Sequence, residues 1–254
     1  MVPKRQKLDD VSEDEVVQLE LEGFSPQPED RDGIIQLLKQ AMPKDSNLSL
    51  GGIADYIIAH STVGTVVKNC FDDAELDAAV SDDDNIIFSL TTVVSLTNSA
   101  ASRSSVISDL RVFLNSFLSR AGLQTQDSRV ISKILSGASS QKPALLLNER
   151  FVNLPPSIAA QAVAALPSEV QNLPDDERPT HLIILTRALR SEPSNDLIYV
   201  QPEMEIVRKV AIAAVEIISV DSTVDEETET ITYVIMAIDF NSLPEILELL
   251  ADAP

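Results

Sequence analysis

Residues 144–163 read ALLLNERFVNLPPSIAAQAV, and this stretch decides the fold. Its first four residues, 144–147, are apolar and do not alternate with polar ones, which predicts a strand buried on both faces. Three polar residues, 148–150, are expected to interrupt this strand as a turn, and Phe151 and Val152 resume the apolar run. The sequence therefore predicts a core strand followed directly by another element.

That following element is expected to be a helix. Asn153 has a side chain that can cap a helix by accepting a hydrogen bond from a first-turn N–H. Pro155 and Pro156 suit the first turn, because a missing N–H costs nothing there and the fixed φ is already helical. The residues predicted to face the core share one side of this helix; they are Ile158, Ala159, Ala162, Val163 and Leu166.

The residues LLNERFVNLPPSIA at 146–159 resemble the signature of the BCCIP family, eukaryotic proteins named for binding a breast-cancer susceptibility protein and a cyclin-dependent kinase inhibitor. Two further segments occur in the order that the family requires, DGIIQLLKQ at 32–40 and VGTVVK at 63–68, the latter ahead of an acidic stretch. The resemblance covers most of residues 16–250 and is weaker after Pro167. It implies a sheet-and-helix arrangement like that of the GCN5-related acetyltransferases.

The pattern along the chain predicts one α/β (α+β) domain over residues 16–254, with a mixed, mostly antiparallel sheet flanked by helices. Strands separated by helices can pair in parallel, whereas hairpins are antiparallel. Strands are expected at 16–22, 62–68, 85–96, 144–147, 181–190, 205–220 and 230–239. Helices are expected at 32–42, from Ser49, at 106–121, at 128–135, after Asn153 and from Pro244, with loops at 166–179 and 191–202.

The net charge is −21, from 40 acidic and 19 basic residues. This balance argues against direct binding of nucleic acid through its phosphates. A basic protein is the complementary partner. The alternative is that the acidity serves solubility alone.

The acidic residues are clustered rather than mixed with bases. Nine acids and no base lie between Lys7 and Arg31, seven and none between Lys68 and Arg103, and ten and none after Lys209. Such segregation produces a local field. The connection at 71–84 is either a solvated loop or a surface helical turn, and its candidate client-binding residues are Asp72, Asp73, Glu75, Asp82, Asp83 and Asp84.

Residues 1–15 combine a basic cluster with an acidic run and predict a disordered tail. Lys4, Arg5 and Lys7 have the form of a nuclear import signal, so the protein is expected in the nucleus, with shuttling to the cytoplasm. The single cysteine, Cys70, excludes an internal disulfide and fits a reducing compartment. No apolar signal peptide and no run of 18 apolar residues is present, so no membrane association is expected.

No catalytic or cofactor-binding pattern is evident. The R/Q-x-x-G-x-G/A turn with which acetyltransferases bind a pyrophosphate is not among the seven glycines, and His60, His181 and Cys70 fall short of a four-ligand zinc site. Acids near Cys70 would raise the pKa of its thiol. We therefore expect no enzyme activity, cofactor or metal.

The polar residues of the signature are expected to be structural. Glu149 and Arg150 would tie the strand to the next helix or to a neighbouring element through charge-assisted hydrogen bonds, with contact to a partner as the alternative. The signature residues assigned this structural role are Asn148, Glu149, Arg150, Phe151, Asn153, Pro155 and Pro156.

The family resemblance implies a non-enzymatic nuclear chaperone, a monomer that escorts a basic large-subunit ribosomal protein in 60S ribosome biogenesis and nuclear export. It also implies nuclear transport receptors and cell-cycle or DNA-repair proteins as partners. The alternative is a regulatory adaptor in cell-cycle control, DNA repair or the export of a lipid kinase. A residual acyltransferase is a remote third hypothesis.

Overall fold

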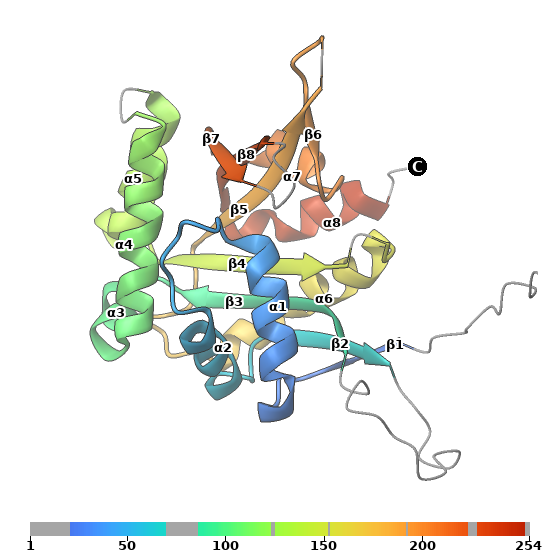
Figure 1. Ribbon diagram of the computed structural model, residues 1–254. Coiled ribbons are helices and arrows are strands. Elements are labelled where there is room, and N and C mark those ends of the chain that lie inside the picture. Colours follow the sequence, from blue (N-terminus) through green and yellow to red (C-terminus); the bar gives the residue numbers. More distant parts are fainter. Residues whose placement is uncertain are drawn as a thin grey trace, which may run out of the picture.

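The computed structural model describes residues 21–69, 86–122, 125–151, 153–191, 193–222 and 228–251. They form one eight-stranded sheet in the order β1-β2-β3-β4-β5-β8-β7, with β6 paired to β5 (Figure 1). The strands are β1 (Leu21–Phe24), β2 (Thr65–Asn69), β3 (Ile87–Ser95), β4 (Pro143–Arg150), β5 (His181–Arg190), β6 (Leu197–Tyr199), β7 (Ala213–Ser222) and β8 (Thr228–Asp239).

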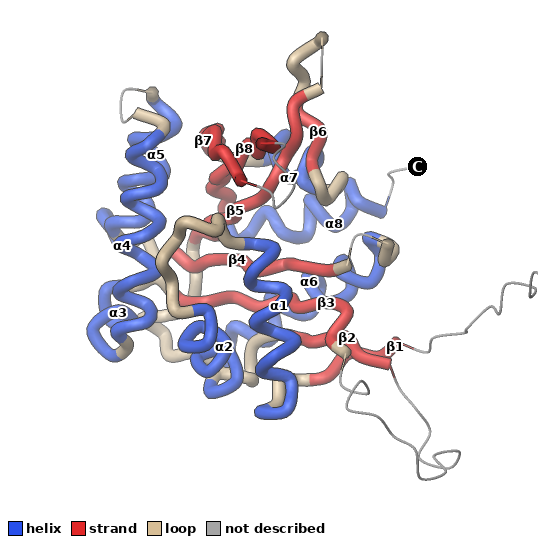
Figure 2. The backbone as a smooth tube through the Cα atoms, viewed as in Figure 1, coloured by secondary structure: helices blue, strands red, loops and turns tan. Residues whose placement is uncertain are grey.

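Helices cover both faces of the sheet. They are α1 (Arg31–Ala41), α2 (Leu50–Ala59), α3 (Asn98–Arg103), α4 (Ser105–Arg120), α5 (Gln126–Ser136), α6 (Pro156–Glu169), α7 (Met204–Val210) and α8 (Leu243–Ala251). One core lies between the sheet and α1, α2, α4 and α5, and the other lies between the sheet and α6, α7 and α8. Figure 2 shows α1 and α2 in front of the strands and α6 behind them.

Strand β4 supplies both cores, because successive side chains of a strand point to opposite faces. Leu145 and Leu147 pack with the first set of helices, whereas Ala144 and Leu146 pack with the second. All four residues are buried. The prediction from the unalternating apolar run is therefore confirmed.

The sheet is mixed and mostly antiparallel, as predicted, since β4 and β5 are the one parallel pair among the described strands. Their pairing runs only from Pro143 opposite His181 to Leu146 opposite Ile184. Beyond this point β6 pairs with β5, from Ala188 to Arg190. Since β8 occupies the other side of β5, β6 stands on the side that β4 has left. The two parallel strands therefore separate after Leu146.

Several predicted elements match the structure closely. The inward residues of α1 are buried, and Ser49 caps α2 by accepting a hydrogen bond from the N–H of Gly52 at 3.2 Å. The predicted apolar face of α4 is also buried. Gly137 ends α5 in the left-handed conformation, with φ of 72°, which glycine adopts without steric cost. Periodicity alone was sufficient for these helices.

The predicted turn at 148–150 is wrong, because β4 continues through Arg150. Asn153 is also not the helix cap, since that position belongs to Pro155 and α6 begins at Pro156. The prolines were correctly placed at the helix start. The polar triplet predicts a turn, but the structure buries Glu149 and Arg150 and keeps them in the strand.

Three other boundaries differ from the prediction. Helix α6 runs through Pro167 to Glu169, because a proline near a helix end removes a single hydrogen bond while keeping a helical φ. The expected strand at 205–220 is instead α7 followed by β7, and the short β6 lies in the expected loop at 191–202. The β-branched residues of α7 favoured a strand, but Met204 and Val207 are buried at helical spacing.

Other predictions lie outside the described residues. These are the tail at 1–15 with Lys4, Arg5 and Lys7, most of the strand at 16–22, Cys70, and the acidic connection at 71–84. At the other end of the chain, Leu249 was expected to pack inward on α8 but is exposed, whereas Ile246 is buried as expected. No helix in the described ranges is both long and apolar enough to span a membrane.

Candidate functional site

The space between the separated ends of β4 and β5 is filled by residues 201–203, which lie between β6 and α7, and by Met204 at the start of α7. Two side-chain contacts bridge the gap from β4. Arg150 donates a hydrogen bond from Nη2 to Oε2 of Glu203 at 2.8 Å, and Gln201 donates one from Nε2 to Oε2 of Glu149 at 3.2 Å. We call this set, Glu149, Arg150, Gln201 and Glu203, the strand junction.

All four side chains of the strand junction are buried, with 8% or less of each residue exposed. The ion pair between Arg150 and Glu203 is therefore largely removed from water. Removing one partner of such a pair leaves an uncompensated charge in the interior, which is strongly destabilising. Glu149 and Arg150 therefore join β4 to the segment before α7.

Burial raises the pKa of Glu149 to about 7, although the nearby guanidinium groups of Arg187 and Arg150 act in the opposite direction. A carboxyl group with such a pKa suits general acid or base chemistry. The space beside it, however, has a volume of about 10 Å³, close to the size of one water molecule. Glu149 thus has no room for a substrate in this structure.

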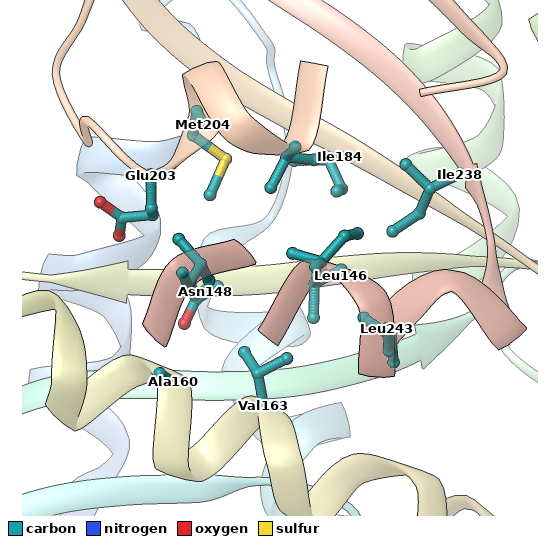
Figure 3. A pocket seen from close by; sticks show the side chains of 12 residues that line it. Leu146, Asn148, Ala160, Val163, Ile184, Glu203, Met204, Ile238 and Leu243 are labelled. Atoms are coloured by element: carbon teal, nitrogen blue, oxygen red, sulfur yellow. The ribbon is translucent and has the colours of Figure 1, made fainter. Parts of the chain in front are cut away.

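An adjoining apolar cavity of about 30 Å³ lies between β4, β5, β8 and the helices α6, α7 and α8. In Figure 3, Leu146 and Val163 point into it from β4 and α6, while the carboxylate of Glu203 turns away from Leu146. Small-molecule sites usually occupy about 300 to 1,000 Å³. This cavity is a packing defect rather than a ligand pocket.

The other signature residues have separate surroundings. Asn148 accepts a hydrogen bond at Oδ1 from Oγ1 of Thr91 on β3, at 2.8 Å. Phe151 packs edge-on against Phe88, with ring centroids 5.8 Å apart. Asn153 and Pro155 are exposed at the entrance to α6. Glu149 and Arg150 thus pair with Gln201 and Glu203 in the strand junction, whereas Asn148 and Phe151 contact β3. Pro155 and Pro156 stand at the start of α6.

The two histidines are held by local hydrogen bonds. His60 Nδ1 lies 2.8 Å from the carbonyl oxygen of Tyr56, and His181 Nδ1 lies 2.8 Å from Oγ1 of Thr180. Within the described ranges no cluster of histidine, cysteine, aspartate or glutamate has the arrangement of a metal site. Each histidine therefore contacts its own end of a helix or strand.

Most of the net negative charge belongs to residues outside the described ranges. Those ranges contain 22 acids and 16 bases, a net charge of −6, so the remaining residues carry −15 of the total of −21. Many described acids also form ion pairs, such as Asp55 with Arg31 at 2.6 Å and Glu216 with Arg190 at 2.6 Å. The described residues therefore carry the smaller part of the net negative charge.

The acidic stretches join the sheet at one end. Leu21 pairs with Asn69, and Lys68 pairs with Ile87, so the stretches before residue 21 and between 69 and 86 attach side by side. The third stretch attaches where Ser222 pairs with Thr228. Following the strand directions across the sheet, this is the end at which β4 and β5 finish.

Gln201 and Glu203 are structural residues that the sequence reasoning missed. Gln201 lies in the loop expected at 191–202 and Glu203 lies just after it, and their partners on β4 are 52 and 53 positions earlier in the chain. The sequence signal was weak: two polar residues directly before the apolar spacing of α7. The pairing with Glu149 and Arg150 follows only from the separation of β4 and β5.

These features define a mixed α/β domain with a closed junction between its parallel strands and with most of its charge in stretches at one end. Residues 16–209 match the model of the family described as BCCIP. Since this is more than half of the chain, the protein belongs to the BCCIP family, as the signature at 146–159 predicted.

Relatives of known name agree with this assignment. The Drosophila melanogaster "Protein BCCIP homolog" is 31% identical over 62% of this chain and 52% of its own length. "Protein bcp1" of Schizosaccharomyces pombe is 26% identical over 70% and 59%, and the human "BRCA2 and CDKN1A-interacting protein" is 27% identical over 62% and 48%. The chain spans about half the length of the curated relatives it matches.

Solved structures support the same fold. The crystal structure of BCP1 from Saccharomyces cerevisiae aligns over 97% of this chain and 93% of its own, with a TM-score of 0.63 and 20% identity. The loading GNATL domain of CurA from Lyngbya majuscula aligns over 87% and 98%, with a TM-score of 0.39 and 11% identity. The second similarity is too low to support an argument, whereas the first shows the fold of this chain.

Proposed function

We propose that this protein is a non-enzymatic nuclear escort for a basic large-subunit ribosomal protein, acting in 60S ribosome biogenesis and nuclear export. The observation that carries the proposal is the placement of charge: the described residues have a net charge of only −6, whereas the remaining residues carry −15, mostly in stretches that adjoin strand ends at one end of the sheet. Ribosomal proteins have cationic surfaces made for RNA phosphates. An acidic surface neutralises them before assembly.

The first test is co-elution. We would mix the purified protein with a basic large-subunit ribosomal protein and follow solubility and complex formation over a salt series. A one-to-one complex that keeps the client soluble and weakens as salt rises is expected, because screening shortens the range of charge interactions. Precipitation of the client as in its absence contradicts the proposal.

A second test asks whether the position of the acids matters. Neutralising Asp72, Asp73, Asp82, Asp83 and Asp84 to asparagine should weaken client binding while the melting temperature stays unchanged. A matched control neutralises five exposed acids of the packed domain: Asp32→Asn, Asp109→Asn, Asp196→Asn, Glu245→Gln and Glu248→Gln. Both variants gain the same net charge, so equal losses of affinity would show that only total charge counts.

Localisation is a further part of the proposal. Lys4, Arg5 and Lys7 form a basic cluster of the kind that an import receptor can read, and their replacement by alanine should leave a fluorescent fusion in the cytoplasm. If the fusion remains nuclear, these three residues are not the import signal, and the escort proposal is unaffected.

A regulatory adaptor is the second candidate. One finding favours it: the human relative carries the name "BRCA2 and CDKN1A-interacting protein", which describes binding to a repair protein and a cell-cycle inhibitor. Purification of the protein with its bound partners separates the two hypotheses. A stoichiometric ribosomal protein supports the escort, whereas cell-cycle or repair proteins without one support the adaptor.

A further inference from the structure

The two edges of the sheet are built differently. Strand β1 ends one side with four residues in the described range, whereas β7 ends the other side with ten. An edge strand presents a row of N–H and C=O groups without strand partners, and proteins usually shorten, charge or cover such edges. The long β7 edge therefore requires an explanation.

The register identifies which backbone groups of β7 point away from the sheet. The N–H of Ala214 donates to Oδ2 of Asp127 on α5, at 3.4 Å, and so faces outward. Alternate residues of a strand direct their backbone groups to the same side. The groups of Glu216, Ile218 and Val220 thus point outward, whereas those of Ile217 point toward Tyr233 on β8.

The edge of β7 is covered only near the start of the strand. Asp127 covers Ala214, but no hydrogen bond within the described part of the chain reaches the outward backbone groups of Glu216 or Ile218. The carboxylate of Glu216 is held by Arg190 and Arg208 at 2.6 and 2.8 Å. The strand reads AAVEIISVDS, with neither lysine nor proline, and Ile218 is 63% exposed. Lysine and proline, two common devices against strand addition, are therefore missing from this segment, and the charge of Glu216 is already paired.

We propose that the β7 edge, from Glu216 to Val220, binds an extended cationic segment of a partner protein by strand addition. Main-chain hydrogen bonds would supply affinity, and alternate side chains would supply selectivity. Arg190 and Arg208 offset the charge of Glu216, but residues 221–229 of the sequence contain five acids and no lysine or arginine, so a cationic segment is electrostatically favoured toward the Val220 end of this edge. A second copy would bring the same acids to the edge. The inference rests on the proposed binding of a basic client and assigns that client one contact.

The test uses a synthetic peptide as its probe, so that it does not depend on the ribosomal protein. We would titrate the full chain with acetyl-KVTVKVTVK-amide and follow amide hydrogen exchange by NMR. The outward amides of Glu216, Ile218 and Val220 should become protected, whereas the inward amide of Ile217 is protected already. A peptide with glutamate in place of lysine should not produce this alternating pattern.

Matched variants at one exposed position examine the backbone contact. Ile218→Pro removes the outward N–H and leaves the bonds between β7 and β8, so peptide affinity should fall about tenfold, the value of one good hydrogen bond. Ile218→Thr keeps the N–H and the preference for a strand, and should bind like the original protein. Thermal unfolding of both variants checks that the sheet is intact.

Each outcome has a defined meaning. Equal affinity of the Ile218→Pro and Ile218→Thr variants, or protection without alternation along β7, overturns the proposal. A dimer detected by light scattering that Ile218→Pro dissociates assigns the edge to a second copy instead. If the peptide binds at β7 but the ribosomal protein does not bind, the escort proposal is wrong and strand addition at β7 stands. If the ribosomal protein binds but the peptide does not bind at β7, only strand addition at β7 is wrong.

Discussion

The two halves of β4 have opposite chemistry. From Pro143 to Leu146 the strand is apolar and pairs with β5, whereas its last three residues are polar, and two of them, Glu149 and Arg150, are bridged to the segment before α7. Both halves are mostly buried. The polar residues of β4 therefore occur where the strand no longer pairs with β5, and not where it becomes exposed to solvent.

The comparison also separates two ways of stabilising an interior. The apolar half gains free energy by removing surface from water, without directional requirements. The polar half must match each buried group with a partner, because an unpaired buried charge is expensive. The polar half should therefore be more sensitive to loss of one side chain, and the apolar half should depend on volume.

The largest effect is expected from Arg150→Ala, which leaves Glu203 buried without its cation. We expect a loss of about 4 kcal/mol in the free energy of unfolding, measured with urea. Lys209→Ala, which breaks an exposed pair with Glu205 at 3.3 Å, is the matched control and should cost less than about 1 kcal/mol. Similar losses in the two variants would refute the comparison.

Leu146→Ala tests the apolar half. The side chain borders the existing cavity, so its truncation should enlarge that space and cost about 3 kcal/mol in the same urea experiment. Leu189→Ala is the control, because Leu189 is 46% exposed on β5 and its loss should have little effect on the urea midpoint. A stable Leu146→Ala protein would mean that the surroundings collapse into the cavity.

Glu149→Gln tests the strand junction through pH. Folding raises the pKa of this carboxyl from 4.5 to about 7, so the folded state holds its proton more tightly than the unfolded state. The resulting stability is complete below pH 4.5 and is lost as pH rises toward 7, by up to about 3 kcal/mol. The glutamine side chain stays neutral, so the free energy of unfolding of this variant should not decline over the same pH range. Compared with the original protein, the variant should therefore gain relative stability between pH 5 and pH 8. Parallel unfolding curves across pH would contradict the assignment.

The smallest effect is expected from Val163→Ile, which adds one methylene group at the wall of the cavity. Filling an apolar void should raise the free energy of unfolding by about 0.5 to 1 kcal/mol. Val112→Ile on α4, where the residue is 65% exposed, should leave the melting temperature unchanged. A destabilised Val163→Ile protein would show that the cavity is too narrow for the added group.

Much of the architecture could be predicted locally. The spacing of Ile34, Leu37 and Leu38 predicts α1, and the apolar run at 182–185 predicts the centre of β5. The failures share a cause, since the β-branched residues of α7 and the polar end of β4 have local preferences that the surrounding packing overrides. For the candidate site, Glu149 and Arg150 were identified, but Gln201 and Glu203 were not.

The sequence by itself determined the alternation of strands and helices, the family signature and the clustering of the acids into three stretches without bases. These properties depend on neighbouring residues or on composition. Only the tertiary structure decided that β4 parts from β5 after Leu146, that Glu203 reaches Arg150, and that β7 becomes a sheet edge. Burial of a polar group depends on a partner from a distant segment, and local sequence does not specify where that partner will lie.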